Sequence, residues 1–339
     1  MHCKIQSFAF CVLAYNHEKY IVEHLESIKY LIEVHGAGID FQIIVNDDCS
    51  TDKTLLLINL WLEKHRELFA DIIKIYNINN IGTCSSLKNI LNRVTASHCK
   101  ITAGDDVYSF EDIFKSASSL GHNDILSGIP LSLVDGNLTK NNFDVFNVVA
   151  SDVIYKTSAL INRFKEISVN NAPNIIYKKE HLKNEKIVNF FSRYDVVEDW
   201  PLQIAIAESK ESPKFYLDSV VFVYYRRTSG SAFIVASDRF VKDQTNIFEY
   251  LIRNETSLIK KLILKNRLLC FISDSTFVKR FLNSAKWVYA IRISINIFPI
   301  LKRMNNLNLD VSKYRKHYHE IQNRSKKFYL ETNSYDYNF

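Results

Sequence analysis

Glycine, proline and closely spaced cysteines are scarce in this sequence. Its 339 residues include 8 Gly and 5 Pro, too few for a collagen-like or a Gly/Pro-rich low-complexity chain. The six Cys form no CxxC pair, which argues against a zinc ribbon, a thioredoxin-type motif or a small disulfide scaffold. We therefore expect reduced thiols and a cytoplasmic protein. Hydrophobic residues at 47% and charged residues at 24% are typical of a globular chain with a sizeable core.

Long apolar runs are absent as well. No segment reaches the ~20 apolar residues that a membrane-spanning helix needs. The best candidate, residues 287–301, is interrupted by Arg292 and Asn296. The short apolar run near the N-terminus leads into a polar turn without a small-residue cleavage site, so we expect no signal peptide.

Three motifs of nucleotide-binding and hydrolytic enzymes are missing. No GxGxxG follows the first predicted strand, which argues against a Rossmann dinucleotide site. No GxxxxGK followed by Ser or Thr is present, which argues against a P-loop NTPase. The GxSxG elbow of the α/β-hydrolases is absent too. A catalytic site in this chain must therefore use other residues.

Acidic residues are few in the C-terminal third. Residues 240–339 hold 18 Lys and Arg against 8 Asp and Glu, whereas residues 1–239 hold 25 against 29. A basic region favours anionic partners, and nucleic acid, anionic lipid and a merely solvated helical face are all open at this point. The sequence predicts a unit at 1–238 and a basic helical region at 239–339.

Short apolar runs and helical patterns alternate through the first 110 residues. Strands are predicted at 8–14, 41–45, 72–76 and 100–102, and helices at 17–34, from 51 onward and at 82–94. This alternation predicts βαβ units and a mostly parallel α/β sheet. Further along we expect strands at 124–134, 145–154 and 215–225, a polar loop or inserted helix at 163–187, and helices at 195–209 and from 240.

Polar residues follow three of the four predicted strands. They are Tyr15-Asn16, Asn46-Asp47-Asp48 and Asp105-Asp106. Ligands of such sheets bind outside the carboxyl ends of the strands. The three clusters are therefore predicted to converge on one edge of the sheet and to form the binding site.

Three pairs of charged residues could carry chemistry. Asp105 and Asp106 suit a hard cation such as Mg²⁺ or Mn²⁺, although two adjacent acids also occur in plain polar turns. Glu198-Asp199 precedes a predicted helix, where Asp199 is either an N-cap or a carboxylate general base. The guanidinium groups of Arg226 and Arg227 match phosphate, or they belong to an exposed basic loop.

Taken in order, these clusters resemble the family 2 glycosyltransferases, which are inverting enzymes with a GT-A fold. The resemblance covers about residues 5–235. It is carried by six segments: VLAYNHEKY at 12–20, DDCSTDKT at 47–54, NIGTCSSLKN at 80–89, ITAGDD at 101–106, Glu198-Asp199, and YRRTSGS at 225–231. It implies a Rossmann-like, mostly parallel sheet flanked by helices, followed by a helical C-terminal extension.

The resemblance also implies roles for single residues. Those that would bind the nucleotide-sugar donor are Ala14, Tyr15, Asn16, Asp47, Asp48, Lys88, Asp105, Arg226, Arg227 and Ser231. Asp106, together with Asp105, would hold Mn²⁺ or Mg²⁺, with Asp106 as the more direct ligand. Asp199 would deprotonate an acceptor hydroxyl, which then attacks the anomeric carbon of a nucleotide sugar, with a UDP-sugar favoured.

The sequence departs from the family pattern at four positions, and one of them is Lys88, which replaces the usual Arg of the segment at 80–89. Ala103 stands where the first Asp of the DxD motif is usual, and Thr228 stands where relatives often carry His. Both changes remove candidate metal ligands. Cys49 replaces the Gly of the DDGSxDxT signature, which raises the question whether this turn needs a positive φ.

Three functions from different classes were compared. The leading one is a transferase of bacterial O-antigen or capsule synthesis that acts on a glycan or polyprenyl-linked acceptor. A catalytically silent sugar-nucleotide or glycan-binding protein on the same fold would require a broken set of acids, and Asp105, Asp106 and Asp199 are all present. A nucleic-acid-binding protein is disfavoured because the basic region contains no recognisable module.

The C-terminal region contains one further pattern. Residues 277–303 mix aromatic and aliphatic side chains with six Lys and Arg, as an interfacial helix on an anionic bilayer does. The sequence leaves two alternatives open. This segment either makes peripheral contact with the inner face of the plasma membrane or packs on the catalytic unit or on a second copy in a homo-oligomer.

Overall fold

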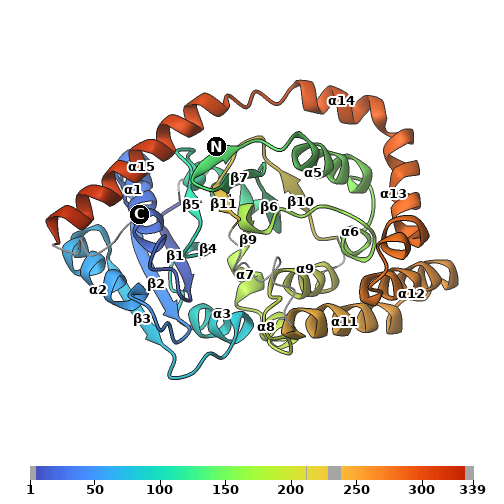
Figure 1. The fold of residues 1–339 in the computed structure, drawn as a ribbon, viewed down its shortest axis with the longest axis horizontal. Helices are drawn as coiled ribbons and strands as arrows, with labels where there is room; N and C mark the ends of the chain where they lie inside the picture. The colour runs from blue at the N-terminus through green and yellow to red at the C-terminus, as the bar shows by residue number, and fades with distance from the viewer. Residues whose placement is uncertain (1–4, 211, 228–237, 333–339) are drawn as a thin grey trace.

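The centre of the molecule is a four-stranded sheet in the order β3-β2-β1-β4, with every neighbouring pair parallel (Figure 1). The computed structural model describes residues 5–210, 212–227 and 238–332. The strands are β1 (Ser7–Ala14), β2 (Asp40–Asp47), β3 (Asp71–Tyr76) and β4 (His98–Ala103). The predicted parallel α/β sheet is confirmed.

Helices cover both faces of this sheet. The connections contain α1 (Ile21–His35), α2 (Thr54–Lys64), a 3₁₀ turn (Arg66–Leu68) and α3 (Thr83–Leu91). Phe8, Phe10 and Val12 of β1 belong to the core cluster of α1 and α2. Ala9 and Cys11 belong to the cluster of α3. Because both faces are covered, β1 is apolar at successive positions, and its sequence is one continuous apolar run.

Two smaller sheets continue the fold beyond β4. One has the order β5-β11-β7-β8 and the other β10-β6-β9. Their strands are β5 (Val107–Tyr108), β6 (Ile125–Ser127), β7 (Leu131–Val134), β8 (Asn137–Thr139), β9 (Ile175–Tyr177), β10 (Phe215–Leu217) and β11 (Val223–Arg226). The helices between them are α4 (Ile113–Ser118), α5 (Asn142–Tyr155), α6 (Leu160–Lys165), α7 (Lys179–Leu182), α8 (Glu185–Phe191) and α9 (Asp199–Glu208), with 3₁₀ turns at Ser119–Gly121 and Ala172–Asn174.

One sequence prediction is wrong in this middle region, and another is incomplete. Residues 145–154, predicted as a strand, lie in α5, whose N-cap Asn141 accepts the backbone N–H of Phe143 at 3.0 Å. The Val-rich run misled because β-branched residues favour strands, yet Val145, Val148 and Asp152 are buried at helical spacing. Residues 163–187, predicted as a loop or helix, include β9, which pairs antiparallel with β6.

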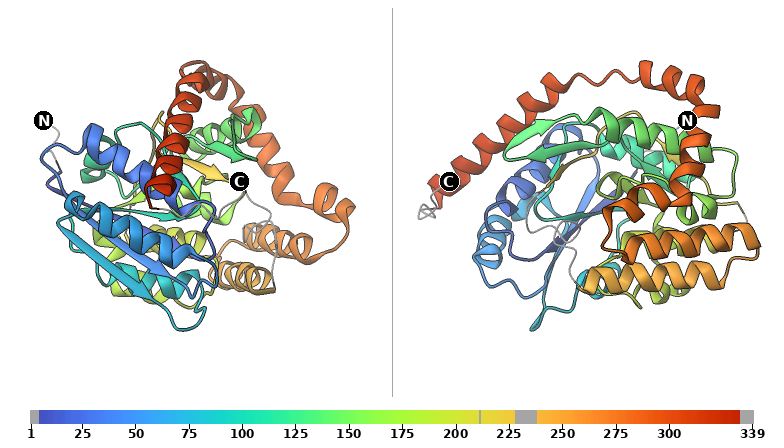
Figure 2. Two further views of the ribbon diagram at one scale, coloured as in Figure 1. Left: turned by 60° about the vertical axis from the view of Figure 1, so that its left-hand side comes forward. Right: turned by 45° about the vertical axis from the view of Figure 1, so that its right-hand side comes forward.

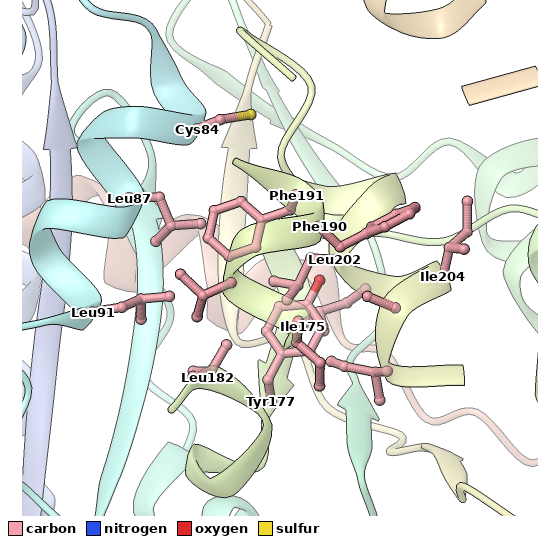
Figure 3. Packing of buried hydrophobic residues seen from close by; sticks show 14 of the residues in the cluster. Cys84, Leu87, Leu91, Ile175, Tyr177, Leu182, Phe190, Phe191, Leu202 and Ile204 are labelled. Carbon is pink, nitrogen blue, oxygen red and sulfur yellow. The ribbon is translucent and has the colours of Figure 1, made fainter. Parts of the chain in front are cut away.

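One core cluster fixes α3 against the middle region (Figure 3). Leu87 and Leu91 of α3 point toward Phe191 of α8, and Leu202 of α9 lies beside Tyr177 of β9 (Figure 3). The residues named are buried in the cluster. This packing sets α9, which begins at Asp199, relative to the parallel sheet.

The C-terminal helices share the core of the rest of the chain. They are α11 (Asp238–Arg253), α12 (Leu258–Ile272), a π-helical turn (Val278–Leu282), α13 (Ser284–Ile295), α14 (Ile297–Asn305) and α15 (Val311–Glu331). Ile247 and Phe248 of α11 join the cluster of α3 and α9, and Phe328 of α15 joins that of α1. Figure 2 shows these helices wrapping around the molecule, with α15 returning across α1. Within the described ranges, no helix is long and apolar enough to cross a membrane.

Candidate active site

The three polar clusters meet at the carboxyl edge of the parallel sheet. Ala14, the last residue of β1, is paired in register with Asp47, the last residue of β2. On the other side of β1, Leu13 is paired with Ala103 at the end of β4. The turns that follow these strands, with Tyr15-Asn16 and Asp105-Asp106, therefore start from one edge, as their spacing predicted.

Asn16 joins the first of these turns to the second. Its Oδ1 accepts the backbone N–H of Thr51 at 2.9 Å, and its own backbone N–H donates to Ser50 Oγ at 2.9 Å. Asn16 has a φ of 54°, in the left-handed region that Asn tolerates better than most residues. The neighbouring Tyr15 is 45% exposed and is free to contact a ligand, whereas Ala14 is buried.

Asp47 is buried and keeps one acceptor atom unused. Its Oδ1 accepts the backbone N–H of Ser50 at 2.9 Å. Its Oδ2 is buried with no hydrogen-bond partner among the residues that the structure describes. Buried polar atoms are nearly always paired, so an unpaired carboxylate oxygen at the ligand edge suits an N–H donor of a bound base.

Asp48 organises the loop between β3 and α3. Its Oδ1 accepts the Nδ2–H of Asn77 at 2.8 Å and the backbone N–H of Ile81 at 2.9 Å, and its Oδ2 accepts that of Gly82 at 3.0 Å. Gly82 has a φ of 84°, and a Cβ there would lie 2.6 Å from the backbone oxygen of Asp195. The glycine thus lets this loop approach the chain that leads to α9.

Cys49, which replaces a glycine of the family pattern, adopts a positive φ. Its φ is 66°, so the turn does require the left-handed conformation. An L-residue there costs roughly 1–2 kcal/mol relative to glycine. The Sγ–H donates to the backbone oxygen of Ile78 at 3.3 Å, which offsets part of this cost.

Arg226 does not face a ligand, contrary to its predicted donor-binding role. It is 6% exposed and forms an ion pair with Glu23 of α1. Its Nε–H donates to the backbone oxygen of Asp105 at 2.6 Å, and its guanidinium lies 4.4 Å from the centroid of the Tyr20 ring. Through its Nε and Nη2 groups, the buried Arg226 side chain ties the turn that carries Asp105 to α1.

Asp106 is more deeply buried than the neighbouring Asp105. It is 3% exposed, and its Oδ1 accepts the backbone N–H of Arg226 at 2.9 Å. Burial, and then repulsion from Asp105, hold the pKa of Asp106 well above its usual range. The Nδ1 of His24 lies 2.8 Å from the backbone oxygen of Asp106, and burial lowers the pKa of His24 to about 4. Asp106 is therefore engaged in joining β11 to the turn after β4.

Asp105 and His17 are the candidate metal donors at this edge. Oδ1 of Asp105 lies 4.0 Å from Nε2 of His17, whose Nδ1 is buried without a partner in the described part of the chain. No group of three or more His, Cys, Asp and Glu in that part could hold a metal ion. A cation that also binds substrate phosphates needs only one or two protein carboxylates, so Asp105 fits such an ion. His17 was quoted within a motif but given no role from sequence.

Glu198 and Asp199 lie at the start of α9. Glu198 is the N-cap residue and makes no side-chain capping bond, and Asp199 is the first helical residue, so Asp199 is not the cap. Burial, and then the Asp199 carboxylate, raise the pKa of Glu198 to about 8. Burial also raises the pKa of Asp199. A carboxylate with a raised pKa is a better proton acceptor, as a general base requires.

Acids from both segments act electrostatically on the phenol group of Tyr225 in β11. Burial raises the pKa of Tyr225 to about 12, and the charges of Asp106, Asp105 and Asp199 contribute to this rise. The electrostatic field of both pairs thus reaches one phenol group. Arg227, the next cation, is exposed and pairs with Asp144 at 2.7 Å.

Sequence reasoning missed two residues of α11. Oδ2 of Asp243 accepts the backbone N–H groups of Asp195, Val196 and Val197 at 2.8, 2.7 and 3.1 Å. Arg239 makes a two-pronged ion pair with Asp195, and its Nη1–H donates to Asn80 Oδ1 at 3.0 Å. No motif marks these residues, because their partners lie more than 40 positions away in the sequence.

Two predicted donor-binding residues remain. Lys88 lies half-buried in the last turn of α3. Ser231, with Thr228 of the same predicted loop, lies outside the described residues.

Comparisons with known proteins agree with this geometry. The model of the family described as "Glycosyl transferase family 2" matches residues 9–184, more than half of the chain. The poly(ribitol-phosphate) beta-N-acetylglucosaminyltransferase TarS of Staphylococcus aureus is 26% identical over 196 residues, which make up 53% of this chain. The match spans 31% of that protein, so the chain corresponds to about a third of this curated relative.

Two solved structures show the same fold. The structure of S. aureus TarS 1-349 in complex with UDP-GlcNAc covers 95% of this chain and 89% of its own, at 20% identity and a TM-score of 0.54. The mannosyltransferase PcManGT from Pyrobaculum calidifontis, in complex with GDP-Man and Mn²⁺, covers 99% of this chain and 89% of its own, at 15% identity and a TM-score of 0.55. The fold is GT-A, as expected, and the chain belongs to glycosyl transferase family 2.

Proposed function

We propose that this protein transfers a sugar, with inversion, from a nucleotide-sugar donor to a hydroxyl of a glycan or lipid-linked glycan. The observation that carries the proposal is the link between the sheet edge, which bears Asp105, and the start of α9, which bears Asp199. Asp48 of that edge accepts the backbone N–H of Gly82, and the backbone N–H of Cys84 in the same loop donates to the backbone oxygen of Asp195 at 3.0 Å, just before α9. This combination serves an inverting transfer, because one carboxylate can hold a cation at the leaving diphosphate while another acts as base on the acceptor.

The donor's nucleotide is proposed to lie against the ends of β1 and β2. The free Oδ2 of Asp47 accepts an N–H of the base, and exposed Tyr15 lies beside it. Asn16 and Asp48 hold the surrounding loops in place. Asp105 is the proposed metal contact in place of Asp106, whose Oδ1 is occupied by the Arg226 amide. Arg227, Lys88 and Ser231 are proposed for the diphosphate.

The chemical step is a single in-line displacement. Asp199 takes the proton from the acceptor hydroxyl, whose oxygen forms a bond to the anomeric carbon. The bond from that carbon to the phosphate oxygen breaks, and the nucleoside diphosphate leaves with the electron pair. A bound Mn²⁺ or Mg²⁺ supplies positive charge for the diphosphate. The raised pKa of Asp199 increases its affinity for the proton.

A UDP-sugar is the favoured donor, and synthesis of a bacterial surface polysaccharide is the favoured setting. A structural neighbour of the same fold binds UDP-GlcNAc, and a curated relative acts on poly(ribitol-phosphate), a polymer of sugar-alcohol phosphate. Another neighbour binds GDP-Man, so GDP-sugars belong in the same test. O-antigen and capsule are the polymers we propose for this chain.

The test is a screen of UDP-, GDP- and dTDP-sugars for thermal stabilisation and for slow hydrolysis, with and without Mn²⁺ or Mg²⁺. We expect one class to raise the melting temperature and to be hydrolysed. Asp47→Asn should abolish the stabilisation, whereas Asp40→Asn, an exposed position at the opposite end of β2, should preserve it. Stabilisation without hydrolysis or transfer would instead assign the chain as a silent binding protein. No response to any donor would overturn the proposal.

A further inference from the structure

Helix α12 exposes an apolar face to solvent. Leu258, Leu262, Leu269 and Ile272 are 72%, 57%, 62% and 53% exposed. Their spacing of four, seven and three residues places them on one side of the helix, whereas buried Leu264 and Cys270 lie on the other side. A surface helix usually turns polar residues outward, so this second apolar face is unusual.

The following elements extend this face. Phe281 precedes α13, and Trp287 and Ile291 of α13 and Phe298 of α14 are all exposed. Across the described chain, thirteen of the 23 exposed large hydrophobic side chains fall within residues 258–301. Such a concentration marks a contact surface rather than scattered exposure. We call the exposed apolar side chains of residues 258–301 the outer face.

Hydrogen bonds join the elements of the outer face. Asn266 of α12 donates through Nδ2 to the backbone oxygen of Leu282 at 3.1 Å, and its Oδ1 accepts the backbone N–H of Ser284 at 2.8 Å. The indole N–H of Trp287 donates to the backbone oxygen of Phe281 at 2.9 Å. Figures 1 and 2 show α12, α13 and α14 as consecutive segments along the outside of the molecule. These bonds fix α12, the π-helical turn and the start of α13 relative to one another.

The elements that carry the outer face are rich in Lys and Arg and poor in acids. Residues 256–305 contain ten Lys and Arg and a single acid, Asp274. Three of these cations are neutralised by acids of the catalytic unit: Lys260 and Arg292 by Glu166, and Arg303 by Asp152. No acidic group of the described chain forms a salt bridge with the six cations Lys261, Lys265, Lys279, Arg280, Lys286 and Lys302. Uncompensated positive charge is therefore carried by the same elements as the exposed apolar side chains, and exposed Lys265 lies on the apolar side of α12 itself.

We propose that the outer face docks on an anionic lipid bilayer. Apolar and aromatic side chains beside Lys and Arg match the boundary between acyl chains and acidic headgroups. A second copy of the same surface would bring these six uncompensated cations against the same six. An acidic bilayer supplies both the apolar phase and the opposite charge. The proposal concerns a surface outside the donor site and does not depend on which sugar is transferred.

The test is co-sedimentation of the full chain with vesicles of phosphatidylcholine alone and of phosphatidylcholine mixed with phosphatidylglycerol. We expect binding to the acidic vesicles only, reduced by added salt. The double change Lys279→Glu and Arg280→Glu should weaken this binding about 10- to 100-fold, since each basic residue near the surface contributes independently. Trp287→Ser should weaken it as well, while the melting temperature stays close to that of the unmodified protein.

The matched control is Lys326→Glu with Lys327→Glu, two exposed cations of α15 whose reversal changes the net charge equally. It should bind like the unmodified chain. Equal losses in both double variants, or recovery of the unmodified protein in the supernatant with both lipids, would overturn the proposal. A dimer that Trp287→Ser dissociates would assign the outer face to self-association. Salt-sensitive binding to polyglutamate, without vesicle binding, would assign it to an acidic protein.

Discussion

Oδ2 of Asp243 lies 2.8 Å from the backbone nitrogen of Asp195 and also accepts the next two amides of the chain. One buried carboxylate oxygen of α11 thereby fixes the segment that leads directly to Glu198-Asp199. Helix α11 lies outside residues 9–184, which match the family model, yet it supports the proposed catalytic base. The C-terminal helices are therefore part of the machinery around the site.

Asp243→Ala should disturb both stability and turnover. The change leaves three amide donors without their acceptor, and we expect the free energy of unfolding to fall by about 3 kcal/mol. Turnover should fall about 10- to 100-fold with a smaller change in the donor KM, because the base is displaced rather than the donor pocket. Asp238→Ala, at the exposed start of the same helix, is the control. Unchanged turnover in Asp243→Ala would show that α11 does not position the proposed catalytic base.

Asp199→Asn should remove the proposed general base while preserving donor affinity. Because asparagine cannot take the proton, turnover should fall about 10²–10⁴-fold. Isothermal titration with the donor should give nearly the same Kd as the unmodified enzyme. A transfer rate near that of the unmodified enzyme would show that another group acts as base.

Glu198 should make stability depend on pH. Its pKa rises from 4.5 to about 8 on folding, so the folded chain holds a proton that the unfolded chain has released between these values. The contribution of Glu198 to stability is therefore lost as pH rises through this window. Urea unfolding of the unmodified protein and of Glu198→Gln, compared from pH 5 to pH 8, measures this difference. The variant should show a flatter profile, and identical profiles would contradict the burial of an ionisable Glu198.

Asp105 and Asp106 should respond differently to substitution. Asp105→Ala should weaken donor binding in Mn²⁺ and make the remaining binding insensitive to EDTA, because Asp105 is the proposed metal contact. Asp106→Ala should chiefly lower the melting temperature, because it leaves the buried Arg226 amide without its acceptor. Calorimetric titrations with and without EDTA, together with thermal melts, separate the two effects. If EDTA does not affect the unmodified enzyme, the metal is not required.

Arg226 and Arg227 form a matched adjacent pair. Arg226→Ala breaks a buried ion pair and leaves Glu23 uncompensated, so the free energy of unfolding should fall by about 3 kcal/mol. Arg227→Ala removes an exposed cation and should leave stability nearly unchanged while weakening donor binding about tenfold. Denaturant titration and donor titration of both variants test the contrast. If Arg226→Ala instead weakened donor binding and Arg227→Ala instead lowered stability, Arg226 would be assigned to binding of the diphosphate.

The sequence by itself determined the parallel sheet and the edge at which the polar clusters meet. Strand and helix periodicity is local, and the carboxyl ends of parallel strands must share an edge, so the clusters at Asn16, Asp47 and Asp105 could be placed together. The family motifs lie in these same turns because their residue types satisfy local geometry. Cys49 is an instance, since it adopts the positive φ that the family's glycine would adopt.

Only the tertiary structure decided which of these charged residues are available to a ligand. Arg226 and Arg227 look equivalent in sequence, but Arg226 is buried and pairs with Glu23, 203 residues earlier in the chain, whereas Arg227 is exposed. Asp243 reaches the segment before Asp199 across more than 40 residues. Such distant partners decide whether a charged side chain is exposed to solvent or is buried and paired within the protein. Those contacts form only when helices and strands pack together, so a local pattern of residues does not predict them.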